Sequence, residues 1–480
     1  MKLGNLLEGV SVHSCGADPN LEISGISYDS KTVRPGQIFT AIAGEAADGI
    51  SYADEAAHNG AACMACDRPV KTNIPVVLVE NARHALAEIS ANYFQHPARE
   101  MTMAGITGTN GKTTSSYLVK HILETCGSGR VGLIGTICNM VGSERLSTER
   151  TTPESYEVQK LLRRMVSGGC RCAVMEVSSH ALVLSRVRGI RFSTGAFTNL
   201  TQDHLDFHRT MERYCDAKAK LFRQCDTAVY NFDDPWHERI LHGADCRKIS
   251  FGIGNEAQIR ARDIESCADH VTFTLCTKQE ILPVYLPIPG LFSVYNALTA
   301  LTLCQVLGVP FSDGTRALRS AKGAKGRMEV VPTPGKPYTV LIDYAHTPDA
   351  LENVLKTVRS FARGRTVAVF GCGGDRDRTK RPKMGAIAGR LADFSVVTTD
   401  NPRRERPEDI IADIVRGFQP GSDFRAVTDR AEAIFYALST AKAGDVIVLC
   451  GKGHEDYVEI NQEKFPQDER KIVAQYLKNE

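Results

Sequence analysis

The feature that most constrains the fold is the segment Ile106–Thr114, with the sequence Ile-Thr-Gly-Thr-Asn-Gly-Lys-Thr-Thr, at the end of the apolar run 101–107. We expect the run to be a strand and Lys112 to begin a helix. A strand that enters such a turn leaves several backbone N–H groups directed at one point, and the helix N-terminus adds roughly half a positive charge there. The sequence therefore predicts an anion site where Lys112 and Thr113 face a nucleotide's phosphates and their magnesium ion.

The spacing of this loop differs from the general phosphate-loop pattern, which places a glycine five positions before Gly111. Position 106 is Ile, and the first glycine is Gly108. This departure argues against a GTPase or an ordinary kinase and favours a narrower class of ATP-using enzymes. A glycine-rich turn without function is the alternative, which the position between strand and helix disfavours. The residues expected to contact ATP are Gly108, Thr109, Asn110, Gly111, Lys112, Thr113 and Thr114.

Composition sets the class of protein. A chain of 480 residues, 42% hydrophobic and 24% charged, is long enough for two to four globular domains. Its net charge of +2 provides no basic surface that would imply a nucleic acid partner. We find no apolar run near the roughly 18 residues of a membrane span and no leader segment, and so expect a cytoplasmic protein without membrane insertion. The fifteen cysteines are scattered, which is typical of small buried hydrophobic residues rather than of zinc sites or disulfides.

Strand and helix patterns alternate along the chain in three blocks, which predicts an α/β protein with three domains. We expect a small α/β N-terminal domain over 1–98, a central P-loop ATPase-like domain over 99–329 and a Rossmann-like α/β C-terminal domain over 330–480. Near-continuous apolar strands alternating with helices indicate parallel sheets covered on both faces. The strand-rich interval 259–287 is interpreted as a small β insertion, and a helix over 153–166 is expected to begin at Pro153 with Thr152 as its N-cap.

In the third block each predicted strand runs directly into a polar signature. Ligands of open α/β sheets bind at the carboxyl ends of the strands, so these signatures predict one face of a binding crevice. The Gly-Cys-Gly-Gly part of one signature lacks the spacing of a dinucleotide fingerprint, which disfavours a dehydrogenase. The signatures occupy 343–346, 371–376, 400–403 and 451–455.

Three further residues are candidates for the phosphate-binding site. Glu176 ends an apolar strand, where a carboxylate can hold a magnesium ion that bridges nucleotide phosphates. His204 follows another strand and can reach the same site, although a loop histidine without function is the more common case. Lys218 has Lys220 beside it, and a solvated pair is the simpler interpretation.

Ten motifs, taken in order, resemble those of the Mur ligase family over about residues 28–455. They are GTNGKTT, MEVSSH, TNLTQDHLDFH, YxxAK, GxFxVYN, GRME, DYAHTPD, GGDRD, DNPR and GKGHE. The resemblance implies a monomeric cytoplasmic enzyme of peptidoglycan precursor synthesis. Such an enzyme uses ATP to convert the free carboxylate of a UDP-MurNAc-dipeptide into an acyl phosphate, which an amino acid's amine then attacks.

The resemblance also implies roles for the candidate catalytic set Lys112, Glu176, His204 and Lys218. Lys112 would contact the phosphates, while Thr113 and Glu176 would hold one magnesium ion. His204 and a carbamylated Lys218 would hold or position a second. The remaining ATP contacts implied by the resemblance are Asn296, Arg327 and Asp343.

The positions that match the family's UDP-substrate contacts fall in two groups. Those for the uridine nucleotide are Ser30, Glu45, Ala46 and Ala47, and those for the peptide part are Thr151, Thr152, Ser178 and Arg186. Three positions depart from the family pattern, namely Lys31, Arg150 and Leu184. These departures concern contacts to the sugar nucleotide more than the chemistry.

The motif Asp400-Asn401-Pro402-Arg403 resembles the form that is specific for meso-diaminopimelate, which is lysine with an extra carboxylate. Arg403 can bind that carboxylate with two hydrogen bonds. The matching site also includes Arg376, Asn401, Gly451 and Glu455, with Glu455 suited to the far ammonium group. Three alternatives stay open: a lysine-adding ligase of the same family, a folylpolyglutamate-type ligase and a nucleotide-binding scaffold without catalysis.

Overall fold

A computed structural model of the chain describes residues 1–44 and 47–479. The chain divides into two compact units, one of Met1–Ile259 with Thr299–Gly314 and the other of Arg260–Leu298 with Thr315–Glu480. Over these described residues, no helix is both long and apolar enough to cross a membrane. Eleven of the fifteen cysteines are buried, which confirms the interpretation of these residues as small core side chains.

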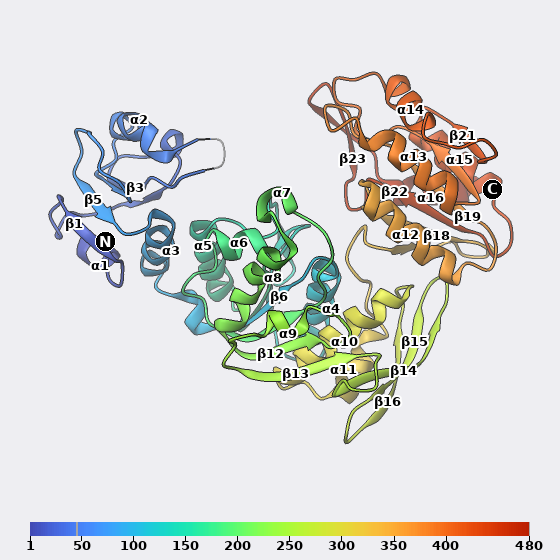
Figure 1. Cartoon of the computed structure of the whole chain (residues 1–480), viewed down its shortest axis with the longest axis horizontal. Coiled ribbons are helices and arrows are strands. Elements are labelled where there is room, and N and C mark those ends of the chain that lie inside the picture. The colour runs from blue at the N-terminus through green and yellow to red at the C-terminus, as the bar shows by residue number, and fades with distance from the viewer. Residues whose placement is uncertain (45–46, 480) are drawn as a thin grey trace. The chain divides into compact units, whose positions relative to one another are not determined.

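The first unit begins with a small five-stranded sheet in the order β1-β5-β4-β3-β2, in which only β1 runs antiparallel to its neighbour (Figure 1). Its helix α3 starts after Asn81, whose side chain accepts a hydrogen bond from the His84 N–H at 3.0 Å. The bounds are α1 (Leu3–Leu6), β1 (Val12–Cys15), β2 (Gly25–Ser27), β3 (Gln37–Thr40), α2 (Ala53–His58), β4 (Cys63–Cys66), β5 (Val76–Val79) and α3 (Ala82–Tyr93).

The rest of this unit is built on a parallel sheet in the order β13-β12-β11-β6-β10-β7, followed by the antiparallel strands β8 and β9. The predicted parallel sheet is therefore confirmed. Strand β6 lies between β10 and β11, so the carboxyl ends of these three strands meet at one edge. The strands are β6 (Thr102–Thr107), β7 (Val131–Ile134), β8 (Asn139–Val141), β9 (Glu144–Leu146), β10 (Cys172–Glu176), β11 (Phe192–Phe197), β12 (Cys225–Asn231) and β13 (Arg247–Gly252).

One predicted helix start in this region is wrong. Helix α5 begins at Ser155 rather than Pro153, and its N-cap is Glu154, whose carboxylate accepts from the Ser155 N–H at 3.3 Å. The Thr152 hydroxyl instead donates to the Glu176 carbonyl at 2.7 Å, which fixes it to the end of β10. The helices are α4 (Lys112–Thr125), α5 (Ser155–Ser167), α6 (Ser179–Val183), α7 (Leu205–His208), α8 (Met211–Ala219) and α9 (His237–Ile240).

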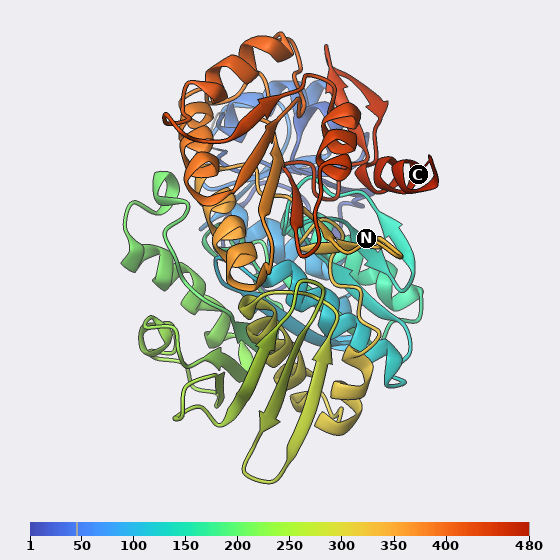
Figure 2. The ribbon, with the colours of Figure 1, turned by 90° about the vertical axis from the view of Figure 1, so that its right-hand side faces the viewer.

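The predicted β insertion is confirmed as three antiparallel strands, β14 (Ile259–Ser266), β15 (Val271–Cys276) and β16 (Ile281–Leu286). Figure 2 shows them side by side in yellow-green. The chain passes between the two units at the start of β14, within α10 (Leu291–Val306) and within α11 (Phe311–Leu318).

The second unit contains a six-stranded sheet in the order β17-β18-β22-β19-β20-β21, parallel except for the edge strand β17. Side chains alternate between its two faces. Leu341 packs with α12 (Pro348–Phe361), α13 (Lys380–Leu391) and α14 (Pro407–Val415), whereas Val340 and Ile342 pack with α15 (Arg430–Ser439) and α16 (Glu469–Asn479). This two-faced burial is what the apolar strands predict. The strands are β17 (Glu329–Val331), β18 (Thr339–Asp343), β19 (Thr366–Phe370), β20 (Phe394–Val397), β21 (Phe424–Ala426) and β22 (Val446–Cys450).

A short antiparallel hairpin follows β22 and leads to the C-terminal helix. The remaining elements of this unit are α12 (Pro348–Phe361), α13 (Lys380–Leu391), α14 (Pro407–Val415), α15 (Arg430–Ser439), β23 (Tyr457–Ile460), β24 (Glu463–Pro466) and α16 (Glu469–Asn479). Pro348 and Pro407 stand at the first positions of their helices, where a missing N–H group removes no helical hydrogen bond.

Candidate active site

The loop between β6 and α4 requires both of its glycines. Gly108 has a φ of +149°, and a Cβ there would lie 1.9 Å from the Thr198 Oγ1. Gly111 is the N-cap of α4 with a φ of +84°, so no side chain at that position competes for the first N–H groups of the helix. The N–H groups and the dipole at the start of a helix favour an anion at such a position.

The segment after β11 holds this loop in shape. The Thr198 hydroxyl donates to the Asn110 carbonyl at 2.6 Å, and the Asn199 Oδ1 accepts from the Asn110 N–H at 2.9 Å. The Thr109 N–H donates to the Asn199 carbonyl at 2.8 Å. Sequence reasoning included Asn199 in a motif but did not assign Thr198 or Asn199 to this role. These three hydrogen bonds fix the shape of the loop before α4.

Two lysines donate to one carbonyl of the loop. The Lys112 Nζ lies 2.9 Å from the Gly108 oxygen and 2.8 Å from the Thr109 oxygen. The Lys218 Nζ lies 2.8 Å from the same Gly108 oxygen and 4.4 Å from the centre of the Tyr214 ring. The simpler interpretation of Lys218 as a solvated residue is wrong, because its side chain is 1% exposed. Burial, followed by the nearby charge of Lys112, lowers the pKa of the Lys218 amine well below its ordinary value.

Glu176 is fully buried at the end of β10 rather than solvated. Its Oε2 accepts from the Thr113 hydroxyl at 2.8 Å and from the Thr136 hydroxyl at 2.9 Å, and its Oε1 accepts from the Thr136 N–H at 3.0 Å. The structure thus brings together the predicted pair Thr113 and Glu176. Thr136 was not predicted, and its only sequence signal is its position just after β7.

The oxygen atoms of Thr113 and Glu176 fit magnesium, which prefers hard oxygen ligands beside substrate phosphates. Within residues 1–44 and 47–479, no three His, Cys, Asp or Glu side chains converge to hold a metal ion. A magnesium ion here would therefore take its remaining ligands from phosphate and water, as such ions usually do.

His204 lies further out than the other predicted catalytic residues. Its backbone φ is +52°, its side chain is about half exposed, and its Nδ1 lies 3.4 Å from the Asp203 Oδ1. Its ring centre is 4.9 Å from that of His180 and 6.2 Å from that of Tyr214. The Lys218 amine packs against the same Tyr214 ring, so Tyr214 lies next to both His204 and Lys218.

The predicted peptide contacts form one group around the end of β10. The Thr151 and Thr136 hydroxyls lie 3.0 Å apart, and the Thr152 hydroxyl lies 3.3 Å from the Ser178 Oγ. Arg186 donates through Nη1 to the Thr152 carbonyl at 3.1 Å. All four predicted residues are therefore brought together next to Glu176.

Three arginines converge on one buried carboxylate beside this group. The Glu154 Oε2 lies 3.3 Å from the Arg186 Nε, 3.2 Å from the Arg83 Nη1 and 3.9 Å from the Arg150 Nη1. Glu154 is 4% exposed. Glu157 is a second carboxylate nearby, and three guanidinium groups against these two still leave an excess of positive charge, which favours an anionic ligand. Arg150, a departure from the family pattern, contributes to this excess.

The predicted uridine contacts lie in the N-terminal part of the unit. Ser30 is buried, and its hydroxyl donates to the Glu55 Oε2 at 2.5 Å. The Ala47 carbonyl accepts from the Gly44 N–H at 2.8 Å. Glu45 and Ala46 lie outside the described residues.

In the second unit, two of the three further ATP contacts are neighbours. The Asp343 carboxylate accepts from the N–H groups of Met328 and Ala345 at 2.8 and 2.9 Å. Burial raises the pKa of Asp343, and the nearby Arg327 opposes that shift. The Arg327 guanidinium lies 5.2 Å from the centre of the Tyr344 ring. Asn296 is buried in α10.

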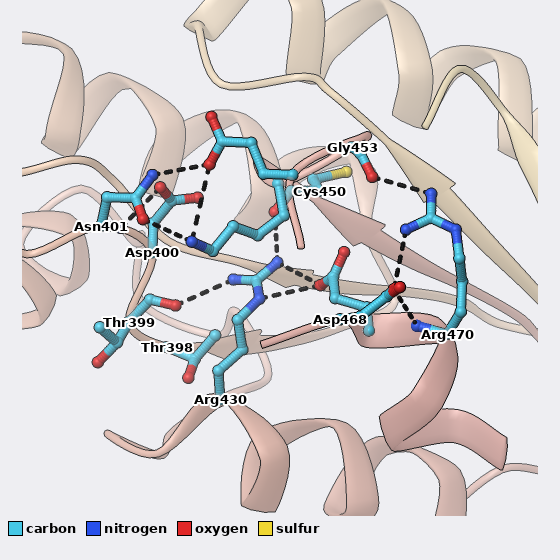
Figure 3. Close-up of polar contacts among 12 residues, drawn as sticks. Thr398, Thr399, Asp400, Asn401, Arg430, Cys450, Gly453, Asp468 and Arg470 are labelled. Atoms are coloured by element: carbon cyan, nitrogen blue, oxygen red, sulfur yellow. Dashed lines mark hydrogen bonds and ion pairs between the residues drawn. The ribbon is translucent and has the colours of Figure 1, made fainter. Parts of the chain in front are cut away.

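Two loops at the carboxyl ends of β20 and β22 contact one another. The Asn401 Nδ2 donates to the Glu455 Oε2 at 2.8 Å, and the Lys452 Nζ donates to the Asn401 Oδ1 at 2.6 Å (Figure 3). Gly451 has a φ of +112°, and a Cβ there would lie 2.4 Å from the Asp400 Oδ2. The predicted residues of both loops are therefore brought together. Lys452 was missed, because a lysine between two glycines in a loop reads as solvated, yet it is fully buried.

Arg403 is held beside these loops rather than free at the surface. Its backbone φ is +52°, its Nε donates to the Glu459 Oε2 at 3.1 Å, and its Nη1 donates to the Gly374 carbonyl at 2.8 Å. A Cβ at Gly373 would lie 2.9 Å from the Arg403 Nη1 and 3.8 Å from the Arg376 Cγ. Arg376 itself is exposed. The two arginines thus flank the turn after β19, within reach of one anionic group.

Comparisons with known proteins cover the whole chain. Three family models match it, described as Mur ligase family, catalytic domain (residues 22–94), Mur ligase middle domain (106–304) and Mur ligase, glutamate ligase domain (326–453). A curated relative from Caldanaerobacter subterraneus subsp. tengcongensis is 45% identical over 99% of both chains. It is named UDP-N-acetylmuramoyl-L-alanyl-D-glutamate–2,6-diaminopimelate ligase.

A second relative, from Clostridium acetobutylicum, has the same name with the number 1 and is 44% identical over 100% of this chain and 99% of its own. A solved structure of a ligase with that name matches with a TM-score of 0.75 and 30% identity, covering 100% of this chain and 99% of the other. The folylpolyglutamate synthase of Mycobacterium tuberculosis shares the fold, with a TM-score of 0.60 and 18% identity over 77% of this chain and 92% of its own.

We predict that Gly108→Ala lowers the affinity for ATP about 100-fold, because the added methyl group displaces the loop from Thr198. Isothermal titration with a non-hydrolysable ATP analogue measures this change. Gly127→Ala at the other end of α4 is the matched control, since Gly127 also has a positive φ of +86° but nothing within 4 Å of its Cβ position. It should lose roughly 1–2 kcal/mol of stability and keep its affinity. Wild-type affinity in Gly108→Ala would contradict the proposed role of the loop.

Proposed function

This chain belongs to the Mur ligase family, and from that premise we propose that it joins meso-2,6-diaminopimelate to UDP-N-acetylmuramoyl-L-alanyl-D-glutamate at the expense of ATP. We propose further that it acts as a cytoplasmic monomer in peptidoglycan precursor synthesis. The observation that best supports the choice of amine is Arg403, which two polar contacts hold beside Asn401 and Glu455.

The reaction must first make a carboxylate electrophilic. An oxygen of the dipeptide's free carboxylate forms a bond to the γ-phosphorus of ATP, and the bond from that phosphorus to the ADP oxygen breaks. The N–H groups at the start of α4 and the Lys112 ammonium are placed to hold the phosphates during this transfer, where positioning and charge stabilisation dominate catalysis. Bound magnesium, for which Thr113 and Glu176 are the proposed ligands, would neutralise phosphate charge.

The second step forms the amide. The amine of diaminopimelate, after loss of its proton, attacks the carbonyl carbon of the acyl phosphate, and the tetrahedral intermediate releases inorganic phosphate. Before this step, ATP and the UDP-linked dipeptide, which are both anionic, must be brought together at the phosphate loop. In our proposal Arg186, beside Thr152 and the end of β10, holds the dipeptide's carboxylate for this purpose.

Lys218 suits a modification by carbon dioxide. Its buried amine has a lowered pKa, and the uncharged nitrogen can form a bond to carbon dioxide with release of one proton, giving a carbamate anion. The carbamate would change the charge beside the phosphate loop from positive to negative. We propose that this anion helps to position magnesium together with His204.

Recognition of diaminopimelate depends on its second carboxylate. A hydrogen bond to a charged group contributes about 1.5–3 kcal/mol, or roughly 10- to 150-fold in affinity. When lysine binds, the second carboxylate that Arg403 and Arg376 would bind is missing, which would raise the discrimination toward ~10⁴. A folylpolyglutamate-type ligase shares the phosphate loop but has no comparable need for these two arginines.

The decisive experiment is a panel of amines, with phosphate release measured in the presence of ATP and the UDP-linked dipeptide. We expect turnover with diaminopimelate and little with lysine, glutamate or no amine. Arg403→Ala should raise the KM for diaminopimelate about 100-fold and leave the KM for ATP within about twofold. The reason is that, of the two substrates, Arg403 is proposed to contact diaminopimelate alone, through its second carboxylate. The neighbouring exposed arginine gives the control, Arg404→Ala, which should behave as wild type. Equal turnover of lysine and diaminopimelate would refute the specificity, and phosphate release without any amine would refute the ligase.

The amine site should depend on pH through Glu455. Burial, opposed by the Asn401 hydrogen bond, raises the pKa of Glu455 above its ordinary value of 4.5. A carboxylate with a raised pKa is protonated first as the pH falls, and it then loses its attraction for the substrate ammonium. The KM for diaminopimelate should therefore rise on the acid side, over a range shifted upward from pH 4.5. In Glu455→Gln we expect a KM for diaminopimelate that is high and does not change with pH over this range. If the KM of this variant still rises as the pH falls, as in the wild type, another group is responsible for the titration.

Lys218→Ala should be nearly inactive and partly rescued by formate or acetate, because a small carboxylate can replace the carbamate. Phosphate release with both substrates measures the rescue. Lys220→Ala is the control, since Lys220 is the exposed lysine two positions away. Full activity of Lys218→Ala without added carboxylate would remove the carbamate from the mechanism.

A further inference from the structure

A fully buried arginine that none of the sequence motifs includes lies directly behind the amine-site loops. Arg430 is 1% exposed and uses all three of its side-chain nitrogens (Figure 3). Its Nη1 donates to the Thr399 carbonyl at 3.0 Å and its Nη2 to the Cys450 carbonyl at 2.9 Å. Its Nε and Nη2 donate to the Glu469 Oε1 at 2.9 and 2.7 Å.

The two carbonyls belong to the last residues before the amine-site loops. Thr399 immediately precedes Asp400, and Cys450 immediately precedes Gly451. Their strands β20 and β22 are not neighbours, because β19 lies between them in the sheet. Sheet hydrogen bonds therefore do not join the ends of β20 and β22 directly, whereas the Arg430 guanidinium does.

The local position of Arg430 is electrostatically unfavourable. It is the first residue of α15, where the positive end of the helix dipole disfavours a cation by about 0.3–1 kcal/mol. Its partner Glu469 is fully buried at the first position of α16, and the Glu469 Oε2 accepts no hydrogen bond from the described residues. A buried ion pair of this kind is weak evidence for stability, since well-packed apolar residues often serve as well. The position of the two carbonyl groups that Arg430 binds gives a more specific reason for burying this ion pair.

We propose that Arg430, oriented by Glu469, is a positioning residue that sets the spacing of the two loops on which the amine substrate binds. Asp400 leaves no room for a Cβ at Gly451, and Asn401 is hydrogen-bonded to Glu455, so a small change in the spacing of the loops alters this packing directly. Arg430 has no contact with the substrate in this role and acts through the loops. The inference rests on the proposed function, because it takes these loops as the diaminopimelate site.

The chain offers a matched control at the opposite end of the same sheet. Arg365 also donates to a carboxylate and a carbonyl, through Nη2 to the Asp445 Oδ2 at 2.7 Å and to the Thr440 carbonyl at 2.7 Å. It precedes β19, and Asp445 precedes β22, so this pair joins the amino ends of the strands. If both arginines only stabilise the fold, replacing either one with lysine should have the same effect on Tm and on the KM values.

The experiment compares Arg430→Lys, Glu469→Gln and Arg365→Lys in the full-length enzyme. Lysine keeps the charge but cannot donate in one plane to two carbonyls and a carboxylate. We expect Arg430→Lys to raise the KM for diaminopimelate at least about tenfold, equivalent to about 1.4 kcal/mol. Its KM values for ATP and for the UDP-linked dipeptide should stay within about twofold. Its preference for diaminopimelate over lysine should also fall. Arg365→Lys should lower Tm without changing any of the three KM values.

A fall in Tm with an unchanged KM for diaminopimelate in Arg430→Lys would overturn the proposal, as would equal KM changes in Arg430→Lys and Arg365→Lys. If Arg430→Lys does not fold, Glu469→Gln decides, because it keeps the arginine and its two carbonyl contacts but removes the counter-charge. A raised KM for diaminopimelate in that variant supports the proposal, and an unchanged one overturns it. A wild-type enzyme that fails to use diaminopimelate would refute the proposed function instead.

Discussion

The carbonyl oxygen of Gly108 is the point on which the geometry of the proposed phosphate site depends. It accepts hydrogen bonds from both the Lys112 and the Lys218 amines, and the loop around it can form only with a glycine at this position. Two amines so close together cannot both keep an ordinary pKa in a buried site. Lys112, at the start of α4, is partly exposed, whereas Lys218 is buried, and burial together with the charge of Lys112 lowers the pKa of Lys218 well below its ordinary value. One backbone oxygen thus holds two identical side chains in different surroundings.

The second unit uses ion pairs for a different purpose. Arg381 is fully buried and donates to Glu405 and Asp413, and the Glu405 Oε1 also accepts from the Asp375 N–H at 2.7 Å. The Glu405 carboxylate, which Arg381 holds, therefore joins the turn after β19 to the loop after β20. Arg430 joins the ends of β20 and β22 in a similar way. Loops at a sheet edge have few backbone partners of their own. Buried guanidinium groups with several planar donors replace those missing partners.

Sequence reasoning predicted most of the strands and helices, and the structure brings several of the predicted site residues together at one sheet edge, because the signals for both are local. Gly108 and Glu176 each stand at the end of an apolar strand. Parallel strands end at a common edge of the sheet, so the sequence predicts that these two residues lie at the same edge. What could not be predicted depends on contacts between distant segments. Thr136 contacts Glu176 across 40 positions, and Arg430 contacts Glu469 across 39. The start of α5 was misplaced for the same reason, since the hydroxyl of Thr152 is taken by the Glu176 carbonyl rather than by the helix.

The distribution of charge in the two units fits the two kinds of substrate. The net charge of +2 is small for 480 residues, so long-range attraction of polyanions is weak, and the cations must act where they are concentrated. In the first unit three arginines surround Glu154 beside Thr152, an excess of cations that suits an anionic group such as a carboxylate. In the second, Arg403 is close enough to Glu455 to act on its charge, so both signs are present there. A molecule with two carboxylates and two ammonium groups requires this mixture, whereas a polyanion would be repelled by Glu455.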